Sequence, residues 1–149
     1  MWPNRKLLDL LGIEVPIIQA PMAGAGGSAM AVATSEAGGL GSLPCAMLDV
    51  AKVRAELGAI RQRTTKPINV NFFCHTPAQP NAGQETAWKA RLAAYYTELG
   101  LDASASPSPV VRTPFDEAMC EIIEELKPEV VSFHFGLPEH SMLSRVKAS

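Results

Sequence analysis

A strand–turn–helix–strand pattern at residues 15–43 constrains the fold more than any other part of this sequence. An apolar run at residues 15–19 is followed by a glycine-rich turn at residues 21–27. Small residues typical of a closely packed helix follow at residues 28–37, and a second apolar run occupies residues 40–43. Such a unit places two strands in parallel with a helix between them. Ligands bind at the carboxyl ends of parallel strands, so the glycine-rich turn is a candidate binding loop.

The same alternation continues along the chain. Apolar runs at residues 68–73 and 130–135 each follow a Lys-Pro pair and predict two further strands. Periodic apolar residues predict helices between the strands, with Ser28 and Asp49 as the caps of the first two. The helices expected after these caps and later in the chain lie near residues 28–37, 50–60, 84–99, 115–126 and from 139 onward. Alternating strands and helices favour an α/β fold with a parallel sheet.

The number of expected strands limits the architecture. Residues 1–149 are predicted to form a single domain with four strands and their helices. A closed (β/α)8 barrel needs eight strands. Four strands therefore form either an open α/β domain or the first half of a barrel.

The composition excludes several classes of protein. Of the 149 residues, 47% are hydrophobic and 19% are charged, with a net charge of −2, so neither nucleic acid nor a membrane is an expected partner. No secretion signal is visible, and we expect a cytoplasmic protein. The three widely spaced cysteines, Cys45, Cys74 and Cys120, form neither a disulfide framework nor a metal-binding pattern.

Two asparagines lie on the strand predicted at residues 68–73. Alternation puts Asn69 and Asn71 on the same face, and a polar side chain on a buried strand requires a partner. Asn71 is nearer the carboxyl end, where a bound cofactor would supply that partner. A hydrogen bond to a neighbouring loop is the alternative.

A histidine lies near the end of the last predicted strand. Alternation puts Ser132 and His134 on one face, and Phe133 and Phe135 on the other. An imidazole at the carboxyl end of a strand can take a proton from a bound substrate. A purely structural histidine is the alternative, and His75 is a competing candidate base.

The first glycine-rich turn suits a flat ligand. Small residues allow close approach to the backbone, and the sulfur of Met22 can pack on an aromatic ring. A plain strand-to-helix turn is the alternative. The glycine spacing differs from GxGxxG, so a dinucleotide-binding fingerprint is not supported.

Four segments, IIQAPMAG, SEAGGLGSL, INVNFFCH and VVSFHFGLP, resemble in this order the nitronate monooxygenase family. The resemblance extends over residues 16–138. It implies an FMN-dependent TIM barrel that oxidises alkyl nitronates with O2, giving nitrite and a carbonyl compound. The chain would supply the N-terminal half of that barrel, and the loops of the other half would hold most of the FMN phosphate contacts.

The resemblance also implies roles for individual residues. His134 corresponds to the active-site histidine of the family, which binds the nitro group or acts as base. The residues that would bind FMN are Ala20, Pro21, Met22, Ala23, Gly24 and Asn71. An FMN-dependent enoyl-acyl-carrier-protein reductase and a non-catalytic barrel fragment are the alternatives. A half barrel leaves two sheet edges unpaired, so a homo-oligomer formed through these edges is expected.

Overall fold

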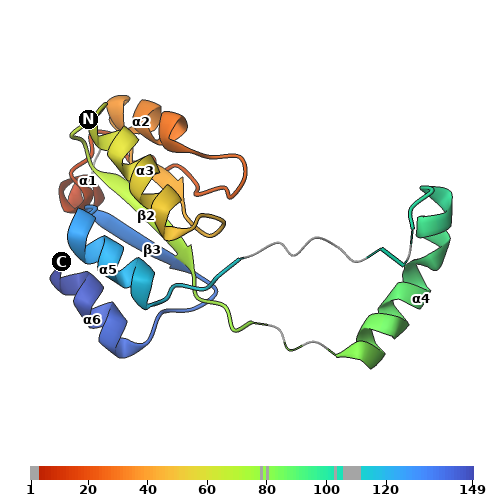
Figure 1. Cartoon of the computed structure of the whole chain (residues 1–149). Helices are drawn as coiled ribbons and strands as arrows, with labels where there is room; N and C mark the ends of the chain where they lie inside the picture. The colour runs from red at the N-terminus through yellow and green to blue at the C-terminus, as the bar shows by residue number, and fades with distance from the viewer. Residues whose placement is uncertain (1–3, 78, 80, 103, 106–111) are drawn as a thin grey trace. The chain divides into compact units, whose positions relative to one another are not determined.

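The computed structural model describes residues 4–77, 79, 81–102, 104–105 and 112–149. They belong to two compact units. We call Met1–His75 with Arg112–Ser149 the sheet unit, and Thr76–Val111 the helical unit. In chain order, the sheet unit contains α1 (Lys6–Leu11), α2 (Ser28–Glu36), β1 (Gly41–Pro44), α3 (Val50–Arg61), β2 (Ile68–Phe73), α5 (Glu117–Leu126), β3 (Val130–His134) and α6 (His140–Ala148) (Figure 1). The helical unit contains α4 (Ala82–Glu98).

The sheet is parallel, as predicted, with the order β1-β2-β3. In its register Ser42 is paired with Asn69, and Asn71 with Ser132. The predicted strand at residues 68–73 is confirmed residue for residue as β2. An α/β architecture built on parallel strands is therefore confirmed for the sheet unit.

The two faces of the sheet differ in chemistry. On one face, Leu43, Val70 and Phe72 pack with apolar residues of α2, α3 and α5 into the main core. Burial of this apolar face is the principal stabilisation of the unit. The opposite face carries Asn69 and Asn71, which are also buried, so this polar face determines where chemistry is possible.

The first predicted strand, at residues 15–19, is wrong as a strand. A single parallel bridge joins Ile18 to Leu40. Pro16 has no N–H to donate to a ladder, and the N–H of Ile17 bonds the carbonyl two residues earlier at 2.8 Å. The segment therefore turns before it can extend, and the sheet has three strands where the sequence predicted four.

One predicted helix cap is confirmed and another is wrong. The Asp49 side chain accepts a hydrogen bond from the Lys52 N–H at 2.8 Å, as a cap does. Helix α2 begins at Ser28 itself, with Gly27 in the cap position. The Ser28 N–H donates to the Glu56 carboxylate of α3 at 3.1 Å, so a distant side chain replaces the local cap.

Helix α4 confirms the helix predicted near residues 84–99, but it has no buried residue. Its large aromatic residues Trp88 and Tyr95 are 59% and 61% exposed. The helical unit contains 36 residues and is too short to enclose a core of its own. Within the described part of the chain, no helix is both long and apolar enough to cross a bilayer.

The amino ends of β1 and β2 are tied to α2 by one serine. The Ser35 hydroxyl donates to the Pro67 carbonyl at 2.9 Å and accepts from the Gly41 N–H at 3.0 Å. A Cβ atom on Gly41 would lie 2.0 Å from the Ala31 carbonyl oxygen. This close approach of helix to strand requires glycine at position 41.

Candidate functional site

The carboxyl ends of β2 and β3 bring three polar side chains into contact. The Asn71 amide nitrogen donates to the Ser132 hydroxyl at 2.9 Å and to the Ser132 carbonyl at 3.1 Å. The amide oxygen of Asn71 lies 3.0 Å from Nδ1 of His134. Asn71 is 1% exposed, whereas His134 is exposed. The partner that the sequence required for Asn71 is therefore supplied by the neighbouring strand.

Aromatic rings surround the histidine. The Phe73 ring lies 6.1 Å from the His134 ring and 4.8 Å from the Phe135 ring, measured between centroids. The prediction that Phe135 shares the face of Phe133 is wrong. Phe135 has a φ of 65°, which ends the strand alternation and turns its ring onto Phe73. Phe133 instead packs against the buried Phe72.

A cavity lies beside this cluster. Its volume is about 240 Å3, and it is lined by Phe73, His75, Arg112 and Phe135. Two of these rings also neighbour His134. A small substrate in the cavity would meet two aromatic rings, the Arg112 guanidinium and the imidazole of His75, the competing candidate base, whereas His134 is not among the lining residues.

The predicted binding loop forms a tight turn. The Met22 carbonyl accepts from the Gly26 N–H at 2.7 Å, and Gly24 has a φ of 81°. The Met22 side chain is 44% exposed, and a Cβ atom on Gly24 would meet no atom within 4 Å. The loop thus presents small residues and one exposed thioether to open space.

A second cavity of about 300 Å3 adjoins this loop. It is lined by Gly24, Gly26, Gly27, Leu43, Pro44, Met47, Leu48 and Glu56. The Glu56 carboxylate already accepts from the first N–H of α2. A carboxylate in that place repels a phosphate, so this end of the molecule suits the uncharged part of a ligand.

The loop and the cluster of Asn71, Ser132 and His134 lie at the same end of the sheet, where the strands have their carboxyl ends. A Cβ atom on Gly26 would be 3.5 Å from Pro44, which is the register partner of Asn71. Across this end of the sheet, the order is therefore the Met22 loop, then β1, then Asn71 of β2, then His134 of β3. Asn71 and His134 lie at the carboxyl ends of neighbouring parallel strands, as expected, whereas the Met22 loop follows a single bridge at Ile18 and not the predicted strand.

The sequence analysis did not predict the polar contacts of Ser42, which lie deeper in the sheet. The Gln19 amide bonds both the N–H and the carbonyl of Ser42, each at 3.2 Å, in place of a strand ladder. Ser42 also accepts from the Asn69 amide at 3.0 Å, while the Asn69 oxygen has no partner among the described atoms. Only a glutamine ending an apolar run signals this arrangement in the sequence.

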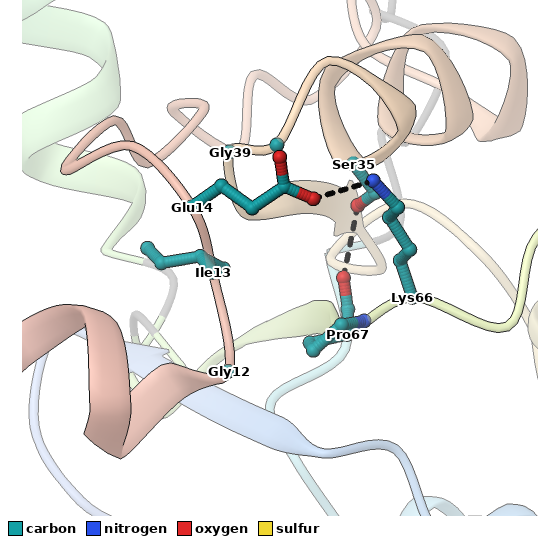
Figure 2. A pocket seen from close by; sticks show the side chains of 8 residues that line it. Gly12, Ile13, Glu14, Ser35, Gly39, Lys66 and Pro67 are labelled. Carbon is teal, nitrogen blue, oxygen red and sulfur yellow. Dashed lines mark hydrogen bonds and ion pairs between the residues drawn. The ribbon is translucent and has the colours of Figure 1, made fainter.

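A small cavity at the opposite end of the strands is structural (Figure 2). Its volume is about 10 Å3, room for a single water. Figure 2 shows Lys66 paired with Glu14 and Ser35 bonded to Pro67 along its wall. It lies at the amino ends of β1 and β2, away from the ligand-binding end of parallel strands.

The cysteines are poor nucleophiles. Burial raises the pKa of the Cys45 thiol to about 12, and Cys120 is fully buried, as expected for a core residue. Burial also raises the pKa of the half-buried Cys74. The described residues contain no group of three or more His, Cys, Asp or Glu side chains that could hold a metal ion.

A sequence model of the family described as nitronate monooxygenase matches residues 4–149. This chain belongs to the nitronate monooxygenase family. The resemblance drawn from the four segments is thereby confirmed. Its relatives include a nitronate monooxygenase from Paraburkholderia phytofirmans, 44% identical over 146 residues. That alignment covers 97% of this chain and 40% of the relative.

Other similar proteins agree with this membership. A nitronate monooxygenase from Pseudomonas aeruginosa is 39% identical, over 96% of this chain and 41% of the relative. The solved nitroalkane oxidase from Streptomyces ansochromogenes superposes with a TM-score of 0.74 at 31% identity, over 95% of this chain and 39% of that one. FabK from Thermotoga maritima gives 0.61 at 25% identity, over 95% and 34%. The chain spans about two fifths of the length of the curated relatives it matches.

Proposed function

We propose that this chain contributes the ring-binding part of an FMN site and the histidine that contacts the substrate in the oxidation of alkyl nitronates. O2 is the second substrate, and the products are nitrite and a carbonyl compound. The bonded pair of Asn71 and His134, at the same end of the strands as an open loop of small residues, is the observation that carries this proposal. Family membership supplies the reaction class.

The residues on the sheet edge fit the flat end of a flavin. Ala20, Pro21, Met22, Ala23 and Gly24 would lie along the ring, with the exposed Met22 sulfur against it. FMN, when bound, would supply the electron acceptor. The Glu56 carboxylate at the start of α2 leaves no place here for the FMN phosphate. The family resemblance assigns most of the phosphate contacts to loops of the other half of the barrel.

Asn71 and His134 would have different tasks. Asn71 is buried with its amide nitrogen bonded to β3 and its oxygen to His134, so it would hold the imidazole in place beside the ligand. His134 is exposed and would bind the nitro group of the nitronate, or take the α-carbon proton of the neutral nitroalkane from which the nitronate forms. Phe73 and Phe135 would exclude water beside it.

The proposal implies that residues 1–149 belong to a single barrel domain of which they form the first half. The parallel sheet, the helices along one face and the polar opposite face support this view, since the polar face would line the barrel interior. The strands of the other half would pair with β3 and with the Ile18 segment.

The direct test is to titrate the purified protein with FMN and then to supply ethyl nitronate. We expect quenching of flavin fluorescence on binding and release of nitrite in the presence of O2. A colourless protein that FMN does not stabilise against heat would contradict the proposal, because a ligand of the native state raises stability. So would consumption of NAD(P)H with an enoyl thioester in place of nitrite release.

We also propose that, in a sample of residues 1–149 alone, the edge of β3 assigned above to the other half of the barrel pairs instead with a second copy of the chain. Phe135 and Leu137, which follow this edge, are 69% and 67% exposed. Unpaired strands with apolar flanks favour edge-to-edge association. Sedimentation velocity is expected to show dimers, and Leu137→Lys should weaken them while Leu10→Lys on α1 does not. A wild-type protein that sediments only as monomer would refute the association.

A further inference from the structure

We infer that Ser132 is a positioning residue that fixes the proton of His134 on Nδ1 and leaves Nε2 free to accept a proton. Ser132 acts through Asn71, which lies between them. The inference rests on the proposed function for its catalytic meaning. The arrangement itself is a property of the protein alone and can be measured without FMN or substrate.

The carbonyl and the hydroxyl of Ser132 together hold the Asn71 amide in one orientation. A backbone carbonyl only accepts hydrogen bonds, so the side-chain atom 3.1 Å from it must be the amide nitrogen. The Ser132 hydroxyl lies 2.9 Å from the same nitrogen and accepts its second hydrogen. Rotating the amide by half a turn would put its oxygen against the carbonyl oxygen. Asn71 is 1% exposed, so water cannot relieve that repulsion.

The fixed amide then decides the state of the histidine. With its nitrogen held by Ser132, Asn71 presents its oxygen to Nδ1 of His134 at 3.0 Å. An amide oxygen can only accept, so a bond across this contact requires a hydrogen on Nδ1. The neutral imidazole then carries its lone pair on Nε2. Within the described residues, Nε2 has no recorded partner, and the ring is exposed.

The register of the sheet makes this relay possible. Asn71 and Ser132 are direct partners across the parallel pair, and His134 follows two residues later on the same face. The catalytic imidazole is thus oriented by the strand that carries it, through a side chain of the adjacent strand. Small displacements of β3 against β2 would change the tautomer as well as the position of the ring.

The test is long-range proton–nitrogen NMR of the imidazole rings in the uniformly 15N-labelled chain, above the pH at which the histidines are charged. The chain has three histidines. The imidazole signals that disappear in His134→Gln are those of His134. We expect the His134 ring in the Nδ1–H form. Ser132→Ala should raise the fraction of the Nε2–H form by about fivefold, since one hydrogen bond to the amide is lost.

The controls separate the relay from general loosening. Ser132→Thr keeps the hydroxyl and should restore the wild-type ratio. Ser42→Ala removes a buried hydroxyl from the same sheet face but touches Asn69 rather than Asn71, so it should leave the ratio unchanged. An Nε2–H form in the wild-type chain, or equal ratios in wild type and Ser132→Ala, would overturn the inference.

This result is independent of the reaction. A chain that shows the Nδ1–H form but binds no FMN would contradict the proposed function and support the relay. A chain that releases nitrite with His134 in the Nε2–H form would support the proposed function and contradict the relay.

Discussion

Replacing His134 with asparagine is expected to lower nitrite release from neutral nitroethane, whose α-carbon still carries its proton, by about 10²- to 10⁴-fold, the contribution typical of a positioned acid or base. The flavin content should change little. His134 contacts Asn71 and the Phe73 ring, whereas the loop proposed for the flavin ring belongs to another part of the sheet edge. Turnover and flavin content measured on the same preparation separate the two effects.

The chain offers a matched control for this replacement. His140 lies at the exposed start of α6, and the Asn71 contact is made by His134 instead. His140→Asn should therefore leave nitrite release at the wild-type rate. Equal activity of His134→Asn and wild type would remove His134 from the mechanism, and loss of flavin in parallel with activity would assign it to cofactor binding instead.

The sequence predicted the end of the sheet at which the site would lie, but not the contacts within the site. An apolar run such as residues 68–73, bounded by Lys-Pro and by a polar loop, has few ways to fold. Strand β2 occupies the same residues as this run. Because the strands are parallel, Asn71 and His134 then lie at the same end of the sheet, near the carboxyl ends of their strands. The bond between them depends on the register of β2 against β3, and pairs of residues 63 positions apart carry no such signal in a single sequence.

The errors in the sequence analysis have local causes. Pro16 reduced a predicted strand to one bridge at Ile18, although the apolar pattern was correct. Phe135 left the expected face because it adopts a positive φ, which periodicity does not reveal for a residue other than glycine. The Ser28 cap was displaced by Glu56, a contact across 28 positions that only the packing of α2 on α3 creates.

Gly41→Ala is expected to lower the free energy of unfolding by more than about 3 kcal/mol, beyond the usual cost of an extra methylene in a packed core. The new Cβ would lie 2.0 Å from the Ala31 carbonyl oxygen and 2.8 Å from the Ser35 hydroxyl oxygen. Both neighbours belong to α2, so the helix must move away from β1. Such a shift breaks the Ser35 bonds to Gly41 and Pro67. Urea denaturation followed by circular dichroism measures the loss.

Gly58→Ala provides the opposite expectation within the same unit. Gly58 lies inside α3, and a Cβ atom there would meet no atom within 4 Å. Removing a glycine from a helix interior should stabilise the protein by about 0.5–1 kcal/mol. Equal unfolding midpoints for Gly41→Ala and wild type would show that α2 can withdraw from β1 at no cost. The packing of α2 on Gly41 would then not be what holds the amino end of β1. The placement of Pro44, at the carboxyl end of β1 and paired with Asn71, would need another explanation.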